Sequence, residues 1–191
     1  MDKYTVFIDA GYLSKVLQHL GNPKLDYLKF SEAVSDGDKR LRTYYYDCAP
    51  YQSSTPTPDE KKRKAGFDRF QQILKRLERF DVRLGKLKKF TVDGTVRYEQ
   101  KMVDILMAIE LVRLAVGKHI QRAVIVTNDT DFIPAINVAK DAGVIVTLYR
   151  GASDHNDALR EACDESKLID KALISNCLFN KAPKKKVSKK K

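Results

Sequence analysis

The feature that most constrains this chain is a series of short strand-like runs separated by longer amphipathic segments. Four runs are rich in aliphatic and aromatic residues, at 4–9, 41–47, 122–127 and 144–149. Strands of this kind have both faces buried, which is typical of parallel sheets covered by helices on both sides. Alternation of strands with helices indicates the same class. We therefore predict an α/β fold with three layers, in which a mainly parallel sheet lies between two layers of helices.

The segments between these runs carry helical periodicity or turn residues. A helical pattern follows Gly11 and continues to Leu20, where Gly21-Asn-Pro stops it. Asp93-Gly94 lies between two strand-like runs, 82–87 and 95–98, and predicts a small β-hairpin. The other expected elements are helices at 25–34, 59–79, 101–116, 132–142 and 157–166, and a short strand at 168–169.

Charge separates the chain into two parts. Seven of its +11 net charges come from lysines in the last eleven residues, KAPKKKVSKKK. This segment has almost nothing to bury, so we expect one domain at 1–180 and a disordered lysine-rich tail at 181–191. A flexible basic tail attracts polyanions, and nucleic acid is the obvious candidate, although such a tail is also typical of a solubilising end.

Cysteine use and hydropathy indicate the compartment. Cys48, Cys163 and Cys177 are far apart and form no CxxC pair, which argues against a zinc site and against a disulfide framework. No apolar run approaches the roughly 20 residues that span a bilayer. The N-terminus enters a strand pattern at once and lacks the features of a signal peptide. We expect a cytoplasmic protein that does not enter a membrane.

Carboxylates follow two of the predicted strands directly. Asp9 ends the first strand, and Asp129 and Asp131 come just after the strand at 122–127. In parallel sheets, ligands lie beyond the carboxyl ends of the strands. If these two strands are neighbours, the three carboxylates converge on one edge of the sheet. Like charges held close together repel, so the convergence needs something that offsets the cost.

A fourth carboxylate belongs to the apolar helix predicted at 101–116. Asp104 is surrounded by apolar residues, so it should face the core or a cleft, and Lys101 lies one turn earlier on the same face. Ligation by oxygen alone suits a hard cation such as Mg²⁺ or Mn²⁺. The predicted metal ligands are therefore Asp9, Asp104, Asp129 and Asp131, and Lys101 would orient Asp104 or donate to a phosphate oxygen.

Each of these residues has a structural alternative. Asp9 and Asp129 are suited to cap the helices that follow them, and Asp131 to lie in a first turn against the helix dipole. Asp104 is suited to a structural ion pair with Lys101. Asp47 also ends a strand, but we expect it at the rim and leave it out of the site. It is the conjunction of four acids that favours a shared metal site.

The order of several motifs resembles the NYN domain, in the PIN-like nuclease superfamily, and the LabA-like branch in particular. These motifs are VFIDAGYL, YYYDCAPY, QKMVDILMAIELV and VTNDTDFIPAINVAKDAGVIVTLY, and the resemblance runs from about Tyr4 to about Asp170. It implies a three-layer fold with a parallel sheet and an acidic cluster that binds divalent metal and cleaves RNA. The family's first-strand Asp corresponds to Asp9, its helical Lys-x-x-Asp to Lys101 and Asp104, and its paired acids to Asp129 and Asp131.

Two positions depart from the family pattern. Tyr12 stands where the family often has Asn, and Asn128 stands where it often has Gly. The predicted function is a metal-dependent endoribonuclease that hydrolyses RNA phosphodiester bonds. The alternative, favoured by Tyr12, is a regulatory module that holds RNA or a protein without cutting it. A third possibility is a phosphatase that acts on small phosphates, but the basic surface argues for a polymeric anion instead.

Substrate contacts are expected on basic and aromatic surfaces. The helix at 61–79 presents many Lys and Arg side chains, which either follow a phosphate backbone or simply form a solvated face. Tyr51 and Tyr98 are candidates to stack on unpaired bases. His19, His119 and His155 lie in unrelated segments and are expected at the surface or at helix ends. The sequence does not determine the oligomeric state, and a homodimer is one option.

Overall fold

The computed structural model describes residues 2–35, 37–92 and 95–179. Two predicted features fall outside these ranges, namely the lysine-rich tail at 181–191 and the Asp93-Gly94 turn of the hairpin.

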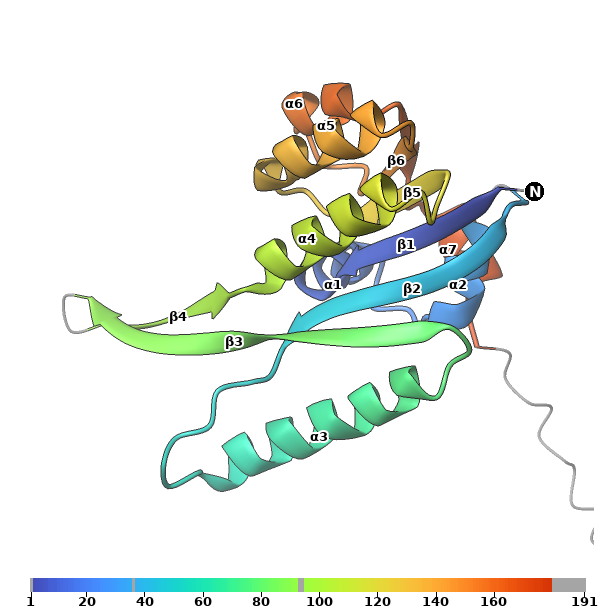
Figure 1. The fold of residues 1–191 in the computed structure, drawn as a ribbon. Helices are drawn as coiled ribbons and strands as arrows, with labels where there is room; N and C mark the ends of the chain where they lie inside the picture. The colour runs from blue at the N-terminus through green and yellow to red at the C-terminus, as the bar shows by residue number, and fades with distance from the viewer. Residues whose placement is uncertain (1, 36, 93–94, 180–191) are drawn as a thin grey trace, which may run out of the picture.

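A twisted seven-stranded sheet runs through the described part of the chain, in the order β4-β3-β2-β1-β5-β6-β7 (Figure 1). Every adjacent pair is parallel except β3 and β4, which are antiparallel. The predicted mainly parallel sheet is therefore confirmed. The strands are β1 (Lys3–Asp9), β2 (Lys39–Cys48), β3 (Phe80–Val92), β4 (Thr95–Lys101), β5 (Arg122–Val126), β6 (Ile145–Arg150) and β7 (Glu165–Leu168).

Helices cover both faces of the sheet. They are α1 (Ala10–His19), α2 (Tyr27–Ala33), α3 (Pro58–Lys75), α4 (Val103–Val116), α5 (Ile133–Asp141), α6 (Asp157–Ala162) and α7 (Lys171–Asn176). Helices α4, α5 and α6 pack on the face to which Phe7 points, and the other helices pack on the face to which Val6 and Ile8 point. Successive residues of a strand face opposite sides, so β1 contributes to both cores. This is the predicted three-layer arrangement.

Helix α4 begins later than its apolar pattern predicts. We expected it to start at Lys101, but Lys101 is the last residue of β4 and the helix begins at Val103. Met102 between them has a φ of 77°, a left-handed conformation that cannot continue a helix. Pairing of Lys101 with Lys86 of β3 holds the strand to that point. The prediction that Lys101 and Asp104 share a helix is therefore wrong.

The C-terminal region also differs from its pattern. The helix expected at 157–166 ends at Ala162, and Glu165–Leu168 forms β7 in place of the expected strand at 168–169. Glu165 accepts hydrogen bonds from Thr147 of β6 and Arg122 of β5, so contacts with distant strands outweigh its local helix preference. Helix α7 was not predicted; Asp170 caps it by accepting a hydrogen bond from the Leu173 N–H at 2.8 Å.

The hairpin of β3 and β4 is longer than expected, and it pairs from Lys86 opposite Lys101 to Val92 opposite Thr95. In Figure 1 it projects beyond the carboxyl ends of the parallel strands. Among the described residues, no helix is both long enough and apolar enough to cross a membrane.

Candidate functional site

Asp9 lies at the carboxyl end of β1, next to the end of β5. The two strands pair in parallel, with Ile8 opposite Val126, so the predicted neighbourhood of their tips is confirmed. The Asp9 side chain caps α1, and its Oδ1 accepts a hydrogen bond from the Tyr12 N–H at 3.2 Å. A Cβ on Gly11 would lie 3.3 Å from this same oxygen, so glycine leaves the carboxylate room.

Asp129 and Asp131 lie just beyond β5, where a 3-10 turn, η1 (Thr130–Phe132), leads into α5. Asp129 begins this turn, and its Oδ1 accepts a hydrogen bond from the Asp131 N–H at 2.9 Å. The capping alternative therefore holds locally for Asp9 and for Asp129. Asp131 is exposed and makes no side-chain hydrogen bond or ion pair with another described residue.

Asp104 joins these residues from the first turn of α4, which packs against η1. Partial burial of its carboxyl group raises its pKa, and the negative charges of Asp129 and Asp131 raise it further, although the residue as a whole is exposed. The sequence separates Asp104 from the other two by more than twenty positions, and the fold brings the three charges together.

The charge of Asp104 also reaches Asp9. Burial is the main reason why the pKa of Asp9 is raised, and the charge of Asp104 adds to it. Backbone hydrogen bonds from Tyr12 and Gly11 and the positive charge of Lys15 act in the opposite direction. Asp9, Asp104, Asp129 and Asp131 thus form one electrostatically connected group, which we call the acidic cluster.

The acidic cluster fits a hard cation by its chemistry but is not a closed ligand set. Its donors are carboxylate oxygens, which Mg²⁺ and Mn²⁺ prefer. Yet in the part of the chain that is described, no three His, Cys, Asp or Glu side chains are grouped closely enough to hold a metal ion. Side-chain rotation is needed to bring the oxygens together, and Asp104 and Asp131, both exposed, have the room for it.

Lys101 was predicted to act beside Asp104, but its side chain lies outside the described residues. Its backbone ends β4, two residues before α4 begins, so the one-turn helical spacing that motivated the prediction is absent.

Asp47, which the sequence analysis left out, is the penultimate residue of the neighbouring strand β2. Asp9 pairs with Tyr46, so Asp47 lies one residue further on and its side chain faces the α1 and α3 side of the sheet. Its Oδ2 accepts a hydrogen bond from Gln71 of α3 at 3.1 Å. Burial raises its pKa to about 6, with a smaller contribution from the charge of Asp9.

The structure adds a contact that sequence reasoning missed. The Tyr12 hydroxyl donates to Asp154 Oδ2, and the Gly151 N–H donates to both the Tyr12 hydroxyl (2.8 Å) and Asp154 Oδ2 (3.0 Å). Asn156 of the same loop donates to the Asn128 carbonyl at 3.1 Å. The loop after β6 is therefore fastened to the ends of β1 and β5. No local pattern indicated this, because the partners are up to 142 residues apart.

A cavity of about 1100 Å³ opens beside the acidic cluster. Asp9 and Asp129 lie at one end, and the walls come from α1, the loop after β6 and the start of α7. Three basic side chains line it, those of Lys15, His19 and Lys171. This volume slightly exceeds the roughly 300–1,000 Å³ of pockets that enclose small-molecule ligands.

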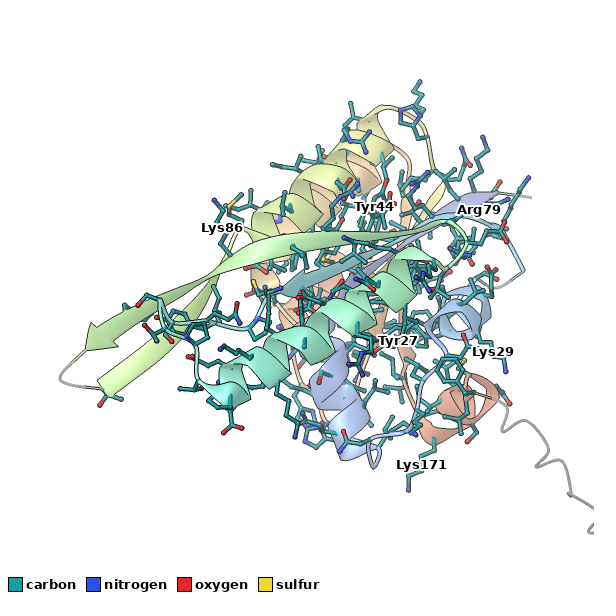
Figure 2. All side chains as sticks on the ribbon, turned by 90° about the horizontal axis from the view of Figure 1, so that it is seen from below. Tyr27, Lys29, Tyr44, Arg79, Lys86 and Lys171 are labelled. Carbon is teal, nitrogen blue, oxygen red and sulfur yellow. The ribbon has the colours of Figure 1, made fainter. Side chains whose placement is uncertain are left out.

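The predicted basic helix is present as α3, and most of its Lys and Arg side chains are exposed, as either reading of it requires. It lies on the opposite face of the sheet from α4 (Figure 1). In Figure 2 the underside of the molecule shows Tyr27 next to α3, where its ring contacts Tyr45 and Phe70. Of the two predicted stacking residues, the side chain of Tyr98 lies outside the described residues, and Tyr51 lies in the partly buried loop before α3.

Comparisons with known proteins agree with the fold. The NYN domain family model matches residues 3–170. Among solved structures, a crystal structure of a protein of unknown function from Vibrio parahaemolyticus has a TM-score of 0.63 and 17% sequence identity. The match covers 93% of this chain and 96% of that one. At this identity the likeness shows a shared fold only. No curated protein matches the chain significantly.

Proposed function

The chain belongs to the NYN domain family, which has a PIN-like nuclease fold, and we propose that it is a divalent-metal-dependent ribonuclease. NYN domains are generally nucleases that act on RNA. The observation that carries the proposal is the acidic cluster at the carboxyl edge of the sheet, beside a cavity that can receive a substrate. The cytoplasm is the compartment in which we propose that it acts.

Each residue of the candidate site has a distinct role in this proposal. Asp9, Asp104, Asp129 and Asp131 would hold Mg²⁺ or Mn²⁺, and a bound ion of this kind lowers the pKa of water and stabilises charge on a phosphate. Burial is the main reason why the pKa of Asp9 and of Asp104 is raised, and repulsion between the acids adds to it; a dication would relieve that repulsion. Tyr12 and Gly11 fix the Asp9 carboxyl group through the cap of α1. Lys101 remains in the proposal as a donor to a phosphate oxygen.

The experiment compares the full chain with Asp131→Asn on single-stranded and structured RNA, with Mn²⁺, Mg²⁺ or EDTA. We expect metal-dependent cleavage that falls on the order of 100-fold in the variant while the circular dichroism spectrum is unchanged. Asp141→Asn is the matched control, because Asp141 is an exposed acid at the far end of α5. Cleavage that survives both EDTA and Asp131→Asn would overturn the proposal.

A second function is favoured by two specific observations. Tyr12 occupies the place of the family's Asn and is tied to Asp154, and Asp9 and Asp129 both already serve as caps. These features suit a regulatory module that binds RNA or a protein without turnover. Metal-independent RNA binding of equal strength in the wild type and in Asp131→Asn, with no cleavage by either, would establish it in place of the nuclease.

A further inference from the structure

The cavity beside the acidic cluster has two chemically different ends. Asp9 and Asp129 line the end at the strand tips. The rest is lined by Lys15, His19 and Lys171, by Asp154 and Asp170, and by small and apolar side chains such as Val16 and Ala172. Lys15 and His19 are one turn apart on the exposed side of α1, so they form a row that leads away from Asp9. Lys171 projects from the start of α7 to the solvent (Figure 2).

Four acids line this cavity, namely Asp9, Asp129, Asp154 and Asp170. Asp154 accepts from Tyr12 and Gly151, and Asp170 accepts from the Leu173 N–H. Lys15, His19 and Lys171 form no ion pair with another described residue. A hydrogen-bonded carboxylate keeps its charge, so a polyanion in this cavity is attracted by the two lysines and repelled by the acids, and a dication at Asp9 and Asp129 would offset part of that repulsion.

We propose that this cavity binds an unpaired stretch of the RNA strand next to the cleaved bond, with Lys15 and Lys171 on backbone phosphates and His19 stacked on a base. This rests on the proposed function for the identity of the ligand and extends it to a strand path. A phosphodiester backbone complements the lysines, and an imidazole ring is a stacking surface for any base.

The proposed contacts call for a single strand. At about 1100 Å³ the cavity has room for a short run of unpaired nucleotides, and only an unpaired base is free to stack on a side chain such as His19. Its wall is also rigid where it meets the acidic cluster, because Tyr12 and Asn156 fasten the loop after β6 to the strand tips. A fixed wall costs little conformational entropy on binding.

The test measures binding separately from cleavage. Fluorescence anisotropy in EDTA follows a labelled single-stranded oligoadenylate of about 12 nucleotides, a length within the site sizes of single-strand binders. The wild type is compared with Lys15→Gln/Lys171→Gln and with His19→Ala. The control is Lys3→Gln/Lys39→Gln, an equal change of charge on two exposed lysines that pair at the amino end of the sheet. The lysine-rich tail is the same in all variants.

The expected result is a roughly 10-fold weaker affinity for the Lys15/Lys171 variant, with a slope of log affinity against log salt smaller by about 1.4, since each phosphate contact contributes about 0.7. His19→Ala should weaken binding about 5-fold or more without changing that slope. The control should bind as the wild type does, and duplex RNA should lose nothing from the cavity substitutions.

Three outcomes overturn the inference. The first is that both cavity variants bind the oligoadenylate as tightly as the wild type does. The second is that the Lys3/Lys39 control loses as much affinity as the cavity variants. The third outcome is a loss confined to a further variant, Lys61→Gln/Lys62→Gln on α3, because it would place the RNA on α3. Failure of cleavage with a cavity-dependent affinity would reject the nuclease proposal and keep the binding site, so the two failures are distinguishable.

Discussion

The tips of β1 and β2 lie side by side and each carries an aspartate, yet the two carboxylates have opposite surroundings. Asp9 lies beside the cavity and is linked by charge to Asp104 of α4. Asp47 also experiences the charge of Asp9, but it is held by Gln71 and by the Cys48 N–H, on the face of the sheet away from α4 and Asp104. Burial raises the pKa of both groups, so the raised pKa alone does not identify a site. What distinguishes Asp9 is its charge contact with Asp104 of α4, which in turn is coupled to Asp129 and Asp131.

The largest expected effect separates the two residues by activity. Asp9→Asn keeps the cap of α1, because an amide oxygen still accepts from the Tyr12 N–H, but it removes one charge from the acidic cluster. We expect cleavage of RNA to fall on the order of 100-fold. Asp47→Asn should change the rate less than about 3-fold, since Asp47 faces away from the cluster. Single-turnover cleavage measures both, and equal losses would erase the distinction.

The next effect concerns the stability of the fold, and we expect Asp47 to influence it more than Asp9 does. Its pKa is about 6 in the folded chain against an ordinary value of 3.8, so the folded state holds the proton more tightly than the unfolded state. Stability therefore falls as the pH rises from about 4 to about 6, and the loss persists above that range. Asp47→Asn removes it, and we expect a gain of about 2 kcal/mol at pH 8 after allowing for solvent screening.

Urea unfolding at pH 8 and at pH 4 measures this gain. The two proteins should converge at pH 4, where the carboxyl group is neutral and resembles the amide. Gln71 accommodates the change by turning its side chain, since its buried Oε1 has no hydrogen-bond partner in the described structure. A gain that is the same at both pH values would assign the effect to packing instead of charge.

The smallest expected effect tests how Asp47 is held in place. Gln71→Leu keeps most of the bulk of this buried residue but removes the donor to Asp47 Oδ2. We expect a loss of about 1 kcal/mol at pH 8, because a carboxylate loses a hydrogen bond, and a smaller loss at pH 4. Urea unfolding checks it, and a Gln71→Leu protein as stable as the wild type at pH 8 would show that the hydrogen bond contributes nothing.

Much of the fold was predictable because it depends on local pattern. The apolar runs at 4–9 and 122–127 became β1 and β5, and the apolar stripe after Asp59 became α3. The site residues were predictable in part for the same reason: an acid at the end of a strand in a parallel sheet has only one edge to occupy. Asp9, Asp129 and Asp131 follow from that rule, and the apolar setting of Asp104 directed it to the same neighbourhood.

Other features required the folded chain. Lys101 carries a helical pattern, but its pairing with Lys86 in the hairpin keeps it in β4. Glu165 has a helical neighbourhood, but Thr147 and Arg122 hold it in β7. Tyr12 and Asp154 meet across 142 residues to form the wall of the cavity.

The sequence by itself determined the three-layer architecture and the edge on which the acids gather, because hydrophobic periodicity and strand direction act over a few residues. Only the tertiary structure decided which face Asp47 takes, where α4 begins and that a cavity with lysines along α1 adjoins the acids. These depend on the register between strands and on contacts between distant segments, and their energies arise only when the whole sheet has formed.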